Sequence, residues 1–456
     1  MIRSISLENF KSWKQIRDMR FAPITGLFGA NSSGKTSILQ WLLMQKQTVE
    51  SGDRAQVLDF GVANDERDYV ELGTFRDAVY EHNESNTLSW EIIWTNSEKK
   101  TFYIEPLIEQ TICTNEDLSF ACKVAENSGQ LLVSYLQYRW GETRYWFSKS
   151  KDNNTFSATI PGESLDFFYP NSEKLIDDPP IEKCYRFSQQ IKSKSFHGES
   201  LRYIEEKYEQ LTRQISYLGP LRSHPYRDYR WGGSRPLDVG QKGERVVEAL
   251  LASRDFGLPP FENGTTYLVE LKVAEWLKKL RLIDSFEINL VSEASRLYQV
   301  EVRKTSDSPP VLITDVGFGI SQILPVIVLC YYVPKGSIII FEQPEIHLHP
   351  SAQSGLADVF IDAIKTRGIQ IILESHSEHL LRRLQRRIAE EKLSTDDVAL
   401  YFCEYERDQS HFKELEVDLY GNIKNWPVDF FGDMMGDVSA MTIAAMDRIL
   451  KDKGVE

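Results

Sequence analysis

The sequence has little of what marks secreted or membrane-spanning proteins. Its five cysteines form no CxxC pair and no zinc-binding spacing. No apolar run approaches the roughly 18 residues of a membrane span, and the start, MIRSISLENFKSW, lacks the apolar core of a signal peptide. We therefore expect a cytoplasmic protein with reduced thiols and no membrane partner.

Positive charge is also scarce. The chain has 53 lysines and arginines against 67 acidic residues, a net charge of −14. Because nucleic-acid phosphates need local positive charge, this excludes a protein that coats DNA over its whole surface. A basic groove, within the chain or at an oligomer seam, stays open. The 456 residues, 41% hydrophobic and 26% charged, suit two or three globular domains or one large α/β domain with insertions.

One segment near the N-terminus carries a phosphate-binding pattern. Residues 29–36, GANSSGKT, match GxxxxGK[ST] between an expected strand over 24–28 and an expected helix over 37–43. The glycines let backbone N–H groups wrap phosphates at a helix N-terminus, which favours anions. We expect Lys35 to reach the outer phosphates and the Thr36 hydroxyl to ligate Mg²⁺. The expected phosphate-binding set is Gly29, Asn31, Ser32, Ser33, Gly34, Lys35, Thr36 and Ser37.

The stretch before this loop adds a family resemblance. NFKSW, at residues 9–13, is followed by GANSSGKTS at 29–37. This arrangement resembles the head domain of ABC-type ATPases of the SMC, RecF and OLD (overcoming lysogenization defect) group. The resemblance implies an ATP site split along the chain, with a signature segment, a Walker B strand and a switch histidine much later. It also implies a dimer that holds ATP between its subunits.

The segment DVGFGISQILP, residues 315–325, lies where the signature helix of that group begins. Gly317 and Gly319 leave the backbone bare, and Ser321 and Gln322 open a helix whose N-terminus can receive the γ-phosphate held by another subunit. The serine that usually precedes the glycines is absent. A structural glycine turn capping a buried helix is the alternative.

The segment IIIFEQPEIHLHP reads as a Walker B strand and the residues after it. Glu342 takes the metal-side acid position, and Gln343 takes the position of the catalytic base, which is usually Glu. An amide can orient water but cannot take its proton, so we expect slow ATP hydrolysis unless Glu345 supplies the base. Metal binding by His347 and His349 is disfavoured, because no matching carboxylate–histidine pattern follows.

The segment IQIILESHSEHLL predicts a buried strand followed by a switch residue. His376 matches the histidine that senses the γ-phosphate, since open α/β sheets bind ligands at the carboxyl ends of their strands. EQPEIHLHP, ESHSEHLL and the late NWPVDFF resemble bacterial OLD-like ATPases without a fused nuclease. Many of these belong to anti-phage defence modules with a separate effector. No TOPRIM-like acidic cluster, DxD or HNH arrangement argues for a nuclease in this chain.

The regions between these motifs predict structure more than chemistry. Residues 85–160 alternate and carry many aromatics, which predicts antiparallel sheet. Residues 163–197 predict a loop or helical insertion, and 198–217 a helix far too short for an SMC arm. Residues 217–236 interleave arginines and aromatics, which suits nucleic acid, a protein interface or the fold interior. Residues 380–388 predict an amphipathic surface helix.

These observations predict a two-lobed α/β ABC-type ATPase head, a P-loop NTPase, with an inserted antiparallel β-rich and helical region. The expected limits are an N-terminal ATPase part at 1–84, the insertion at 85–297, a C-terminal ATPase part at 298–405 and an extension at 406–456. The expected cofactors are ATP and Mg²⁺. We expect a homodimer or larger homo-oligomer that serves as sensor or scaffold for a separate effector, a nuclease or other toxin. The alternative is a RecF-like repair ATPase that binds duplex DNA.

Overall fold

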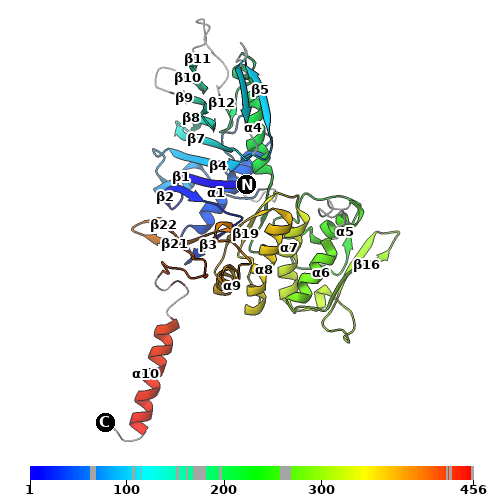
Figure 1. The fold of residues 1–456 in the computed structure, drawn as a ribbon. Coiled ribbons are helices and arrows are strands. Elements are labelled where there is room, and N and C mark those ends of the chain that lie inside the picture. The colour runs from blue at the N-terminus through cyan, green and yellow to red at the C-terminus, as the bar shows by residue number, and fades with distance from the viewer. Residues whose placement is uncertain are drawn as a thin grey trace.

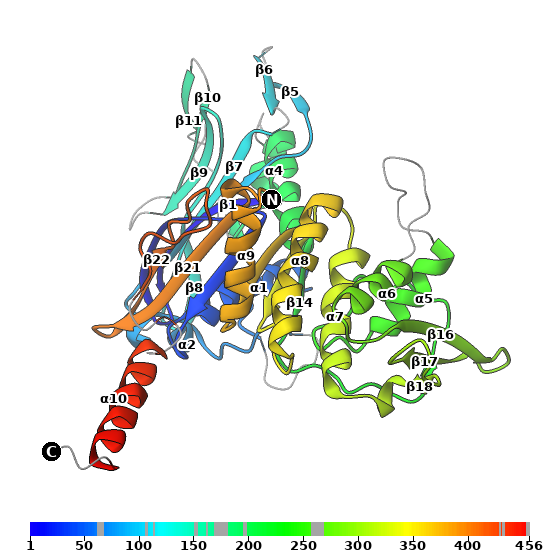
Figure 2. The same ribbon diagram turned by 60° about the horizontal axis from the view of Figure 1, so that its bottom comes forward.

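The computed structural model describes residues 1–456 apart from 62–67, 105–107, 113–114, 150–153, 161–162, 168–180, 195–197, 257–268, 428–429, 431–433 and 453–456. Two sheets dominate the arrangement in Figure 1, one of six strands and one of eight. The helices α5 (Val246–Phe256), α6 (Val269–Lys279) and α7 (Phe318–Tyr332) lie at a different end of the molecule from the eight-stranded sheet in Figures 1 and 2.

The six-stranded sheet carries the phosphate loop and the Walker B strand. Five strands run parallel and the edge strand β22 is antiparallel. In spatial order they are β14 (Ile215–Leu218), β19 (Ile338–Glu342), β20 (Gln370–Glu374), β3 (Ile24–Gly29), β21 (Val398–Glu406) and β22 (Gln409–Glu414). The central strands are continuous apolar runs because both faces of a parallel sheet are buried.

Alternate residues of this sheet enter two different cores. Ile338 and Ile340 pack in the core that contains helix α1 (Lys35–Glu50), whereas Ile339 and Phe341 pack in the core of helices α7 to α9. The second core's helices are α7 (Phe318–Tyr332), α8 (Pro350–Arg367) and α9 (Glu378–Ala389). The strand period of two thus separates the α1 side from the α8 side of the sheet.

The eight-stranded sheet is antiparallel and covers the other side of α1, as the alternating pattern over 85–160 predicts. It joins strands from the start of the chain to the inserted ones, since β1 pairs with both β2 and β4. Its order is β11 (Glu163–Phe167), β10 (Asn154–Ile160), β9 (Thr143–Lys149), β8 (Gln130–Trp140), β7 (Asp117–Asn127), β4 (Leu88–Thr95), β1 (Ile2–Phe10) and β2 (Trp13–Arg20).

Two helices adjoining the first core differ in length from their expectations. The helix expected over 37–43 extends to Glu50, where the Lys183 ammonium donates to the carbonyls of Thr48 (2.7 Å) and Ser51 (2.7 Å). The helix expected over 198–217 is α4 (Gly198–Arg213) and ends earlier, because Ile215–Leu218 pairs with β19. Within 163–197, residues 168–180, including the DDPP stretch, lie outside the described residues.

The remaining elements complete the two ends of the molecule. The strands of a small sheet share a core with α5, α6 and α7, and other short helices and strands connect the larger elements. The residue ranges of these smaller elements are as follows. They are α2 (Phe75–Ala78), β5 (Lys100–Ile104), β6 (Ile108–Ile112), β12 (Ile181–Glu182), β13 (Arg186–Phe187), α3 (Gln189–Lys194), β15 (Tyr229–Arg230), α5 (Val246–Phe256), α6 (Val269–Lys279), β16 (Ser285–Ser292), β17 (Leu297–Arg303) and β18 (Val311–Leu312).

The C-terminal segment divides into a packed part and a projecting part. The Phe430 ring lies against Phe402 and Trp426, with ring centroids 4.8 and 5.0 Å away. Helix α10 (Met434–Asp452) instead points away from the body in both ribbon views. Among the described residues, no helix has both the length and the apolar character needed to cross a membrane.

Candidate nucleotide site

The phosphate loop connects β3 to α1 with a backbone that needs glycine at two positions. Gly29 has φ +135° and Gly34 has φ +90°, both in the region that L side chains rarely adopt. A Cβ on Gly29 would lie 2.0 Å from the Cys403 carbonyl oxygen of the neighbouring strand. The Trp13 indole donates to the Gly34 carbonyl at 2.9 Å, so the β1–β2 turn holds the loop from outside. Helix α1 then begins at Lys35, within the expected phosphate-binding set.

A pocket of about 270 Å³ lies over this loop. Lys35, which is 2% exposed, donates through Nζ to the carbonyls of Gly29 (3.1 Å) and Ala30 (2.6 Å). Burial lowers the pKa of Lys35, and the nearby Glu374 carboxylate acts in the opposite direction. The pocket is lined by Ser12, Asn31, Ser32, Ser33, Gly34, Lys35, Thr36, Ser37, Gln343 and Glu374.

Two carboxylates end adjacent strands beside the loop. Glu342 closes β19 and Glu374 closes β20, and the two are register partners in the parallel ladder. The Thr36 hydroxyl donates to Glu374 Oε2 at 2.7 Å, and the Tyr217 hydroxyl donates to Glu342 Oε1 at 3.0 Å. Burial, and then the negative charge of Glu374, raise the pKa of Glu342 to about 7, while the Tyr217 hydrogen bond opposes this.

Sequence reasoning found Glu342 but missed Glu374 and Tyr217. The available signal was the alternation of side chains along a strand, in which every second residue lies on the same face. Ile340 and Ile372 face the α1 core, so Glu342 and Glu374, two positions later, lie on that face too. This is the side on which α1 lies, with Thr36 in its first turn. No sequence pattern pointed to Tyr217, because the helical spacing over 198–217 predicts a helix where the structure has strand β14.

Gln343 and Glu345, the two alternatives for water activation, occupy different places. Gln343 lines the phosphate pocket, has φ +44°, and its backbone N–H donates to the Glu374 carbonyl at 2.9 Å. Glu345, only 6% exposed, accepts from the Ser375 hydroxyl (2.8 Å) and the His376 backbone N–H (2.7 Å). Burial raises the pKa of Glu345. In this structure Glu345 thus holds the segment that bears His376.

Arg222 lies beneath the same loop and is 8% exposed. Its guanidinium donates to the Gln343 carbonyl at 3.4 Å. Burial lowers the pKa of Arg222 to about 10, while the neighbouring Glu345 carboxylate acts to raise it. Arg222 therefore belongs to the interior of the fold rather than to a nucleic-acid surface, whereas Tyr226 of the same segment is 59% exposed.

His376 follows β20 and has an exposed side chain. Partial removal from water, and then the positive charge of Lys35, lower the pKa of His376, which favours a neutral imidazole at neutral pH. The next residue, Ser377, caps α9 by accepting from the Leu380 N–H at 3.1 Å. The histidine is thus held between two fixed elements at the carboxyl end of the sheet.

The segment expected to be the signature begins α7, with Gly317 at the N-cap position, where an added Cβ would meet open space. A Cβ on Gly319 would come within 3.9 Å of the His347 carbonyl, so the turn borders the residues that follow Walker B. Ser321 and Gln322 are 9% and 3% exposed and face the interior. Only the glycine turn is therefore open to a second subunit, and the four residues do not line the phosphate pocket of their own chain.

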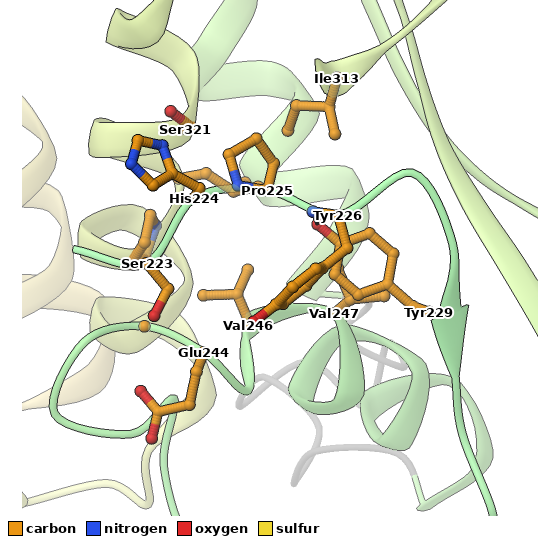
Figure 3. Close-up of a pocket in the computed structure, with 13 residues that line it drawn as sticks. Ser223, His224, Pro225, Tyr226, Tyr229, Glu244, Val246, Val247, Ile313 and Ser321 are labelled. Carbon is orange, nitrogen blue, oxygen red and sulfur yellow. Dashed lines mark hydrogen bonds between the residues drawn. The ribbon is translucent and has the colours of Figure 1, made fainter.

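Ser321 instead lines a small cavity of about 30 Å³ between α7 and the segment after β14. Figure 3 shows His224 and Pro225 beside Ser321, with Tyr226 on the same loop and Tyr229 at the start of β15. This volume holds about one water molecule, which is too little for a small-molecule ligand. The arginine- and aromatic-rich segment thus packs against the signature helix here.

The oxygen donors beside the phosphate loop suit Mg²⁺ better than the histidines after β19 do. His349 caps α8, its Nδ1 accepting from the Ser351 N–H at 3.3 Å. In the part of the chain that the structure describes, no three His, Cys, Asp or Glu side chains form a metal-binding group. Mg²⁺ uses one or two carboxylates together with phosphate oxygens, and Thr36, Glu342 and Glu374 supply oxygen donors of that kind.

Comparisons with solved structures give low scores. The SMC head domain from Thermotoga maritima has 11% identity and a TM-score of 0.37, covering 91% of this chain and 99% of that one. A Pyrococcus furiosus Smc head domain, bound to the C-terminal domain of ScpA, has 12% identity and a TM-score of 0.41, covering 91% and 96%.

A family model decides the classification. The model described as an AAA ATPase domain matches residues 1–381, and one described as a protein of unknown function (DUF3696) matches 393–441. No curated protein matches the sequence. The match over 1–381 includes the phosphate loop, both strand-end carboxylates and His376, and the structure around them is the expected α/β P-loop ATPase fold with an antiparallel β-rich insert. The chain therefore belongs to the AAA ATPase domain family.

Proposed function

We propose that this ATPase is a slow, ATP-gated switch. It binds ATP with Mg²⁺, closes into a dimer around the nucleotide, and in that state controls a separately encoded effector of an anti-phage defence complex. The observation that carries the proposal is that Gln343, an amide residue, lines the phosphate pocket directly after Glu342. The remaining steps rest on the residues around it.

Different residues of the site bind the phosphates, hold the metal and orient water. Backbone N–H groups of the loop and the Lys35 ammonium bind the phosphates, while Thr36 and Glu342 hold the metal, which shields phosphate charge when bound. Gln343 can orient a water molecule by hydrogen bonding but cannot accept its proton. Loss of a general base typically reduces the rate by about 10² to 10⁴, so the ATP-bound state is long-lived.

The open glycine turn supports dimer closure around ATP. Gly317 precedes α7, and no acidic residue lies in that helix's first turn. A helix N-terminus of this kind favours an anion such as the γ-phosphate of ATP bound to a second subunit. The adjacency of Gly319 and His347 places the residues after Walker B next to this turn. Closure would then couple the pocket of one subunit to the signature turn of the other.

Effector control is supported by the family resemblance and by one surface feature. Helix α10 exposes four large apolar side chains, each between 54% and 66% exposed: Val438, Met441, Ile443 and Met446. Methionine-rich surfaces adapt well to partners, and exposed apolar patches mark interaction sites. The defence role itself follows from the resemblance of EQPEIHLHP, ESHSEHLL and NWPVDFF to OLD-like ATPases.

Two measurements test this proposal against the RecF-like alternative. Light scattering with size-exclusion chromatography should show a dimer with ATP and Mg²⁺, and a smaller species for Lys35→Ala under the same conditions. A pull-down of the protein expressed with its neighbouring genes should recover a stoichiometric effector. Salt-sensitive, ATP-dependent binding of duplex DNA by the isolated protein, without such a partner, would instead favour the repair ATPase.

A further inference from the structure

We propose that Glu374 is a second magnesium carboxylate, which makes the pocket accept ATP only as its magnesium complex. The inference rests on the proposed ATP site and adds a residue and a selectivity to it. The Walker B pattern points to Glu342 and the phosphate loop to Thr36. Glu374 is the last residue of a different strand, β20, and lines the phosphate pocket directly.

The contacts of Glu374 place its carboxylate among the groups that handle metal and phosphate. Oε2 accepts the Thr36 hydroxyl proton at 2.7 Å, and Oε1 lies 3.9 Å from the Lys35 ammonium. Both side chains of the Lys35–Glu374 pair are more than nine-tenths buried. The carboxylate therefore sits against the hydroxyl that we expect to ligate Mg²⁺ and beside the ammonium that we expect to bind the outer phosphates.

Glu342 brings a second negative charge to the same place. It pairs with Glu374 across the β19–β20 ladder, and neighbouring parallel strands lie about 4.8 Å apart. Both acids lie on the α1 side of the sheet, because they come two positions after Ile340 and Ile372, which face that side. Two carboxylates at this separation and largely out of water repel each other, and a divalent cation between them removes that repulsion.

The same charges discriminate between forms of the nucleotide. Free ATP would bring its outer phosphates against Glu374, which lines the pocket, with Glu342 on the neighbouring strand and Lys35 as the nearby cation. Magnesium-bound ATP brings a doubly positive ion that uses the carboxylates as ligands, and Mg²⁺ commonly takes one or two protein carboxylates together with phosphates. Glu374 thus opposes the metal-free nucleotide and favours the complex, which one acid at Glu342 would do less strongly.

A purely structural role for Glu374 makes a different prediction. If the carboxylate only accepted the Thr36 hydroxyl proton, a glutamine could do so through its amide oxygen, and metal affinity would not change. The hydrogen bond from Gln343 N–H to the Glu374 backbone carbonyl is independent of the side chain. Glu374→Gln is therefore the informative variant, because it keeps size and acceptor and removes only the charge.

The experiment measures binding rather than turnover. Titration of a fluorescent ATP analogue with Mg²⁺ or with EDTA gives the metal dependence of nucleotide affinity, and electron paramagnetic resonance with Mn²⁺ alone gives the metal affinity of the nucleotide-free protein. Loss of a metal-supporting carboxylate typically costs 10- to 100-fold in metal affinity. We expect this loss of Mn²⁺ affinity in Glu374→Gln, together with tighter binding of the analogue in EDTA than wild type.

The controls separate the possible outcomes. Glu414→Gln, a surface carboxylate paired with Arg20 on β22, should leave both measurements unchanged. Glu374→Asp keeps the charge and should retain the rejection of metal-free nucleotide. Unchanged Mn²⁺ affinity and unchanged behaviour in EDTA for a folded Glu374→Gln would overturn the inference while leaving the ATP switch intact. Failure of the wild type to bind ATP or to dimerise would instead refute the proposed function.

Discussion

The substitution Gln343→Glu tests whether this pocket lacks only its general base. Glutamine and glutamate have the same shape, and the backbone of residue 343 is held by its N–H bond to the Glu374 carbonyl and by Arg222 at its own carbonyl. Gln343 already lines the phosphate pocket. The change therefore places a proton acceptor where the amide stands, with little rearrangement of the loop.

The expected gain combines two opposing effects. A positioned general base contributes about 10² to 10⁴ in rate, which corresponds to about 3 to 5.5 kcal/mol of barrier. A third carboxylate beside Glu342 and Glu374 is disfavoured, and one like charge at about 5 Å costs about 3 kcal/mol at an effective dielectric constant of 20. Subtracting this cost leaves about 0 to 2.5 kcal/mol of the gain, so we expect turnover to rise by at most about 10²-fold.

The assay is single-turnover hydrolysis of radiolabelled ATP, with nucleotide affinity measured in parallel so that binding and chemistry are separated. Glu345→Gln is the matched variant, because an amide oxygen can still accept from Ser375 and from the His376 N–H. We expect that variant to fold and to keep most of the wild-type rate. Unchanged turnover in Gln343→Glu, with an inactive but ATP-binding Glu345→Gln, would show that Glu345 is the base.

Three further predictions concern nucleotide binding and stability. Lys35→Ala should lower ATP affinity by about 10²-fold in calorimetric titrations, since it removes the buried ammonium of the pocket, and near-wild-type affinity would contradict the assignment of the site. Lys183→Met should lower the free energy of unfolding by about 2 to 4 kcal/mol in urea melts, because it leaves the carbonyls at the end of α1 without their charged donor. Burial raises the pKa of Glu205 to about 7, above its ordinary 4.5, so its ionisation opposes folding. The stability of wild type relative to Glu205→Gln should therefore fall as the pH rises from about 4.5 to 7, and a pH-independent difference would refute this.

Much of the nucleotide site could be read from local sequence because its parts are local. The loop at 29–36 needs glycines at fixed positions, and a strand and helix must flank it, so a short segment specifies both its shape and its chemistry. Glu342 and His376 each follow an apolar strand, and parallel strands bring such ends to one edge. Local patterns predicted the ends of helices less well where a contact with a distant segment sets the end. Lys183 binds the Ser51 carbonyl at the end of α1, and residues 215–218 pair with β19 instead of continuing a helix.

The sequence by itself determined that residues 29–36 carry a phosphate-binding pattern with Lys35 and Thr36, and that an amide, Gln343, follows the acid at the end of the apolar run at 338–341. Tertiary structure decided which carboxylates share the pocket: Glu374 reaches Thr36 across 338 positions of the chain, whereas Glu345, two residues from Gln343, turns toward Ser375 and the His376 backbone. The physical reason is that the alternation of side chains along a strand fixes the face of the sheet on which a carboxylate lies. Its neighbours are fixed only by the pairing of the strands and by the bend of the chain after β19.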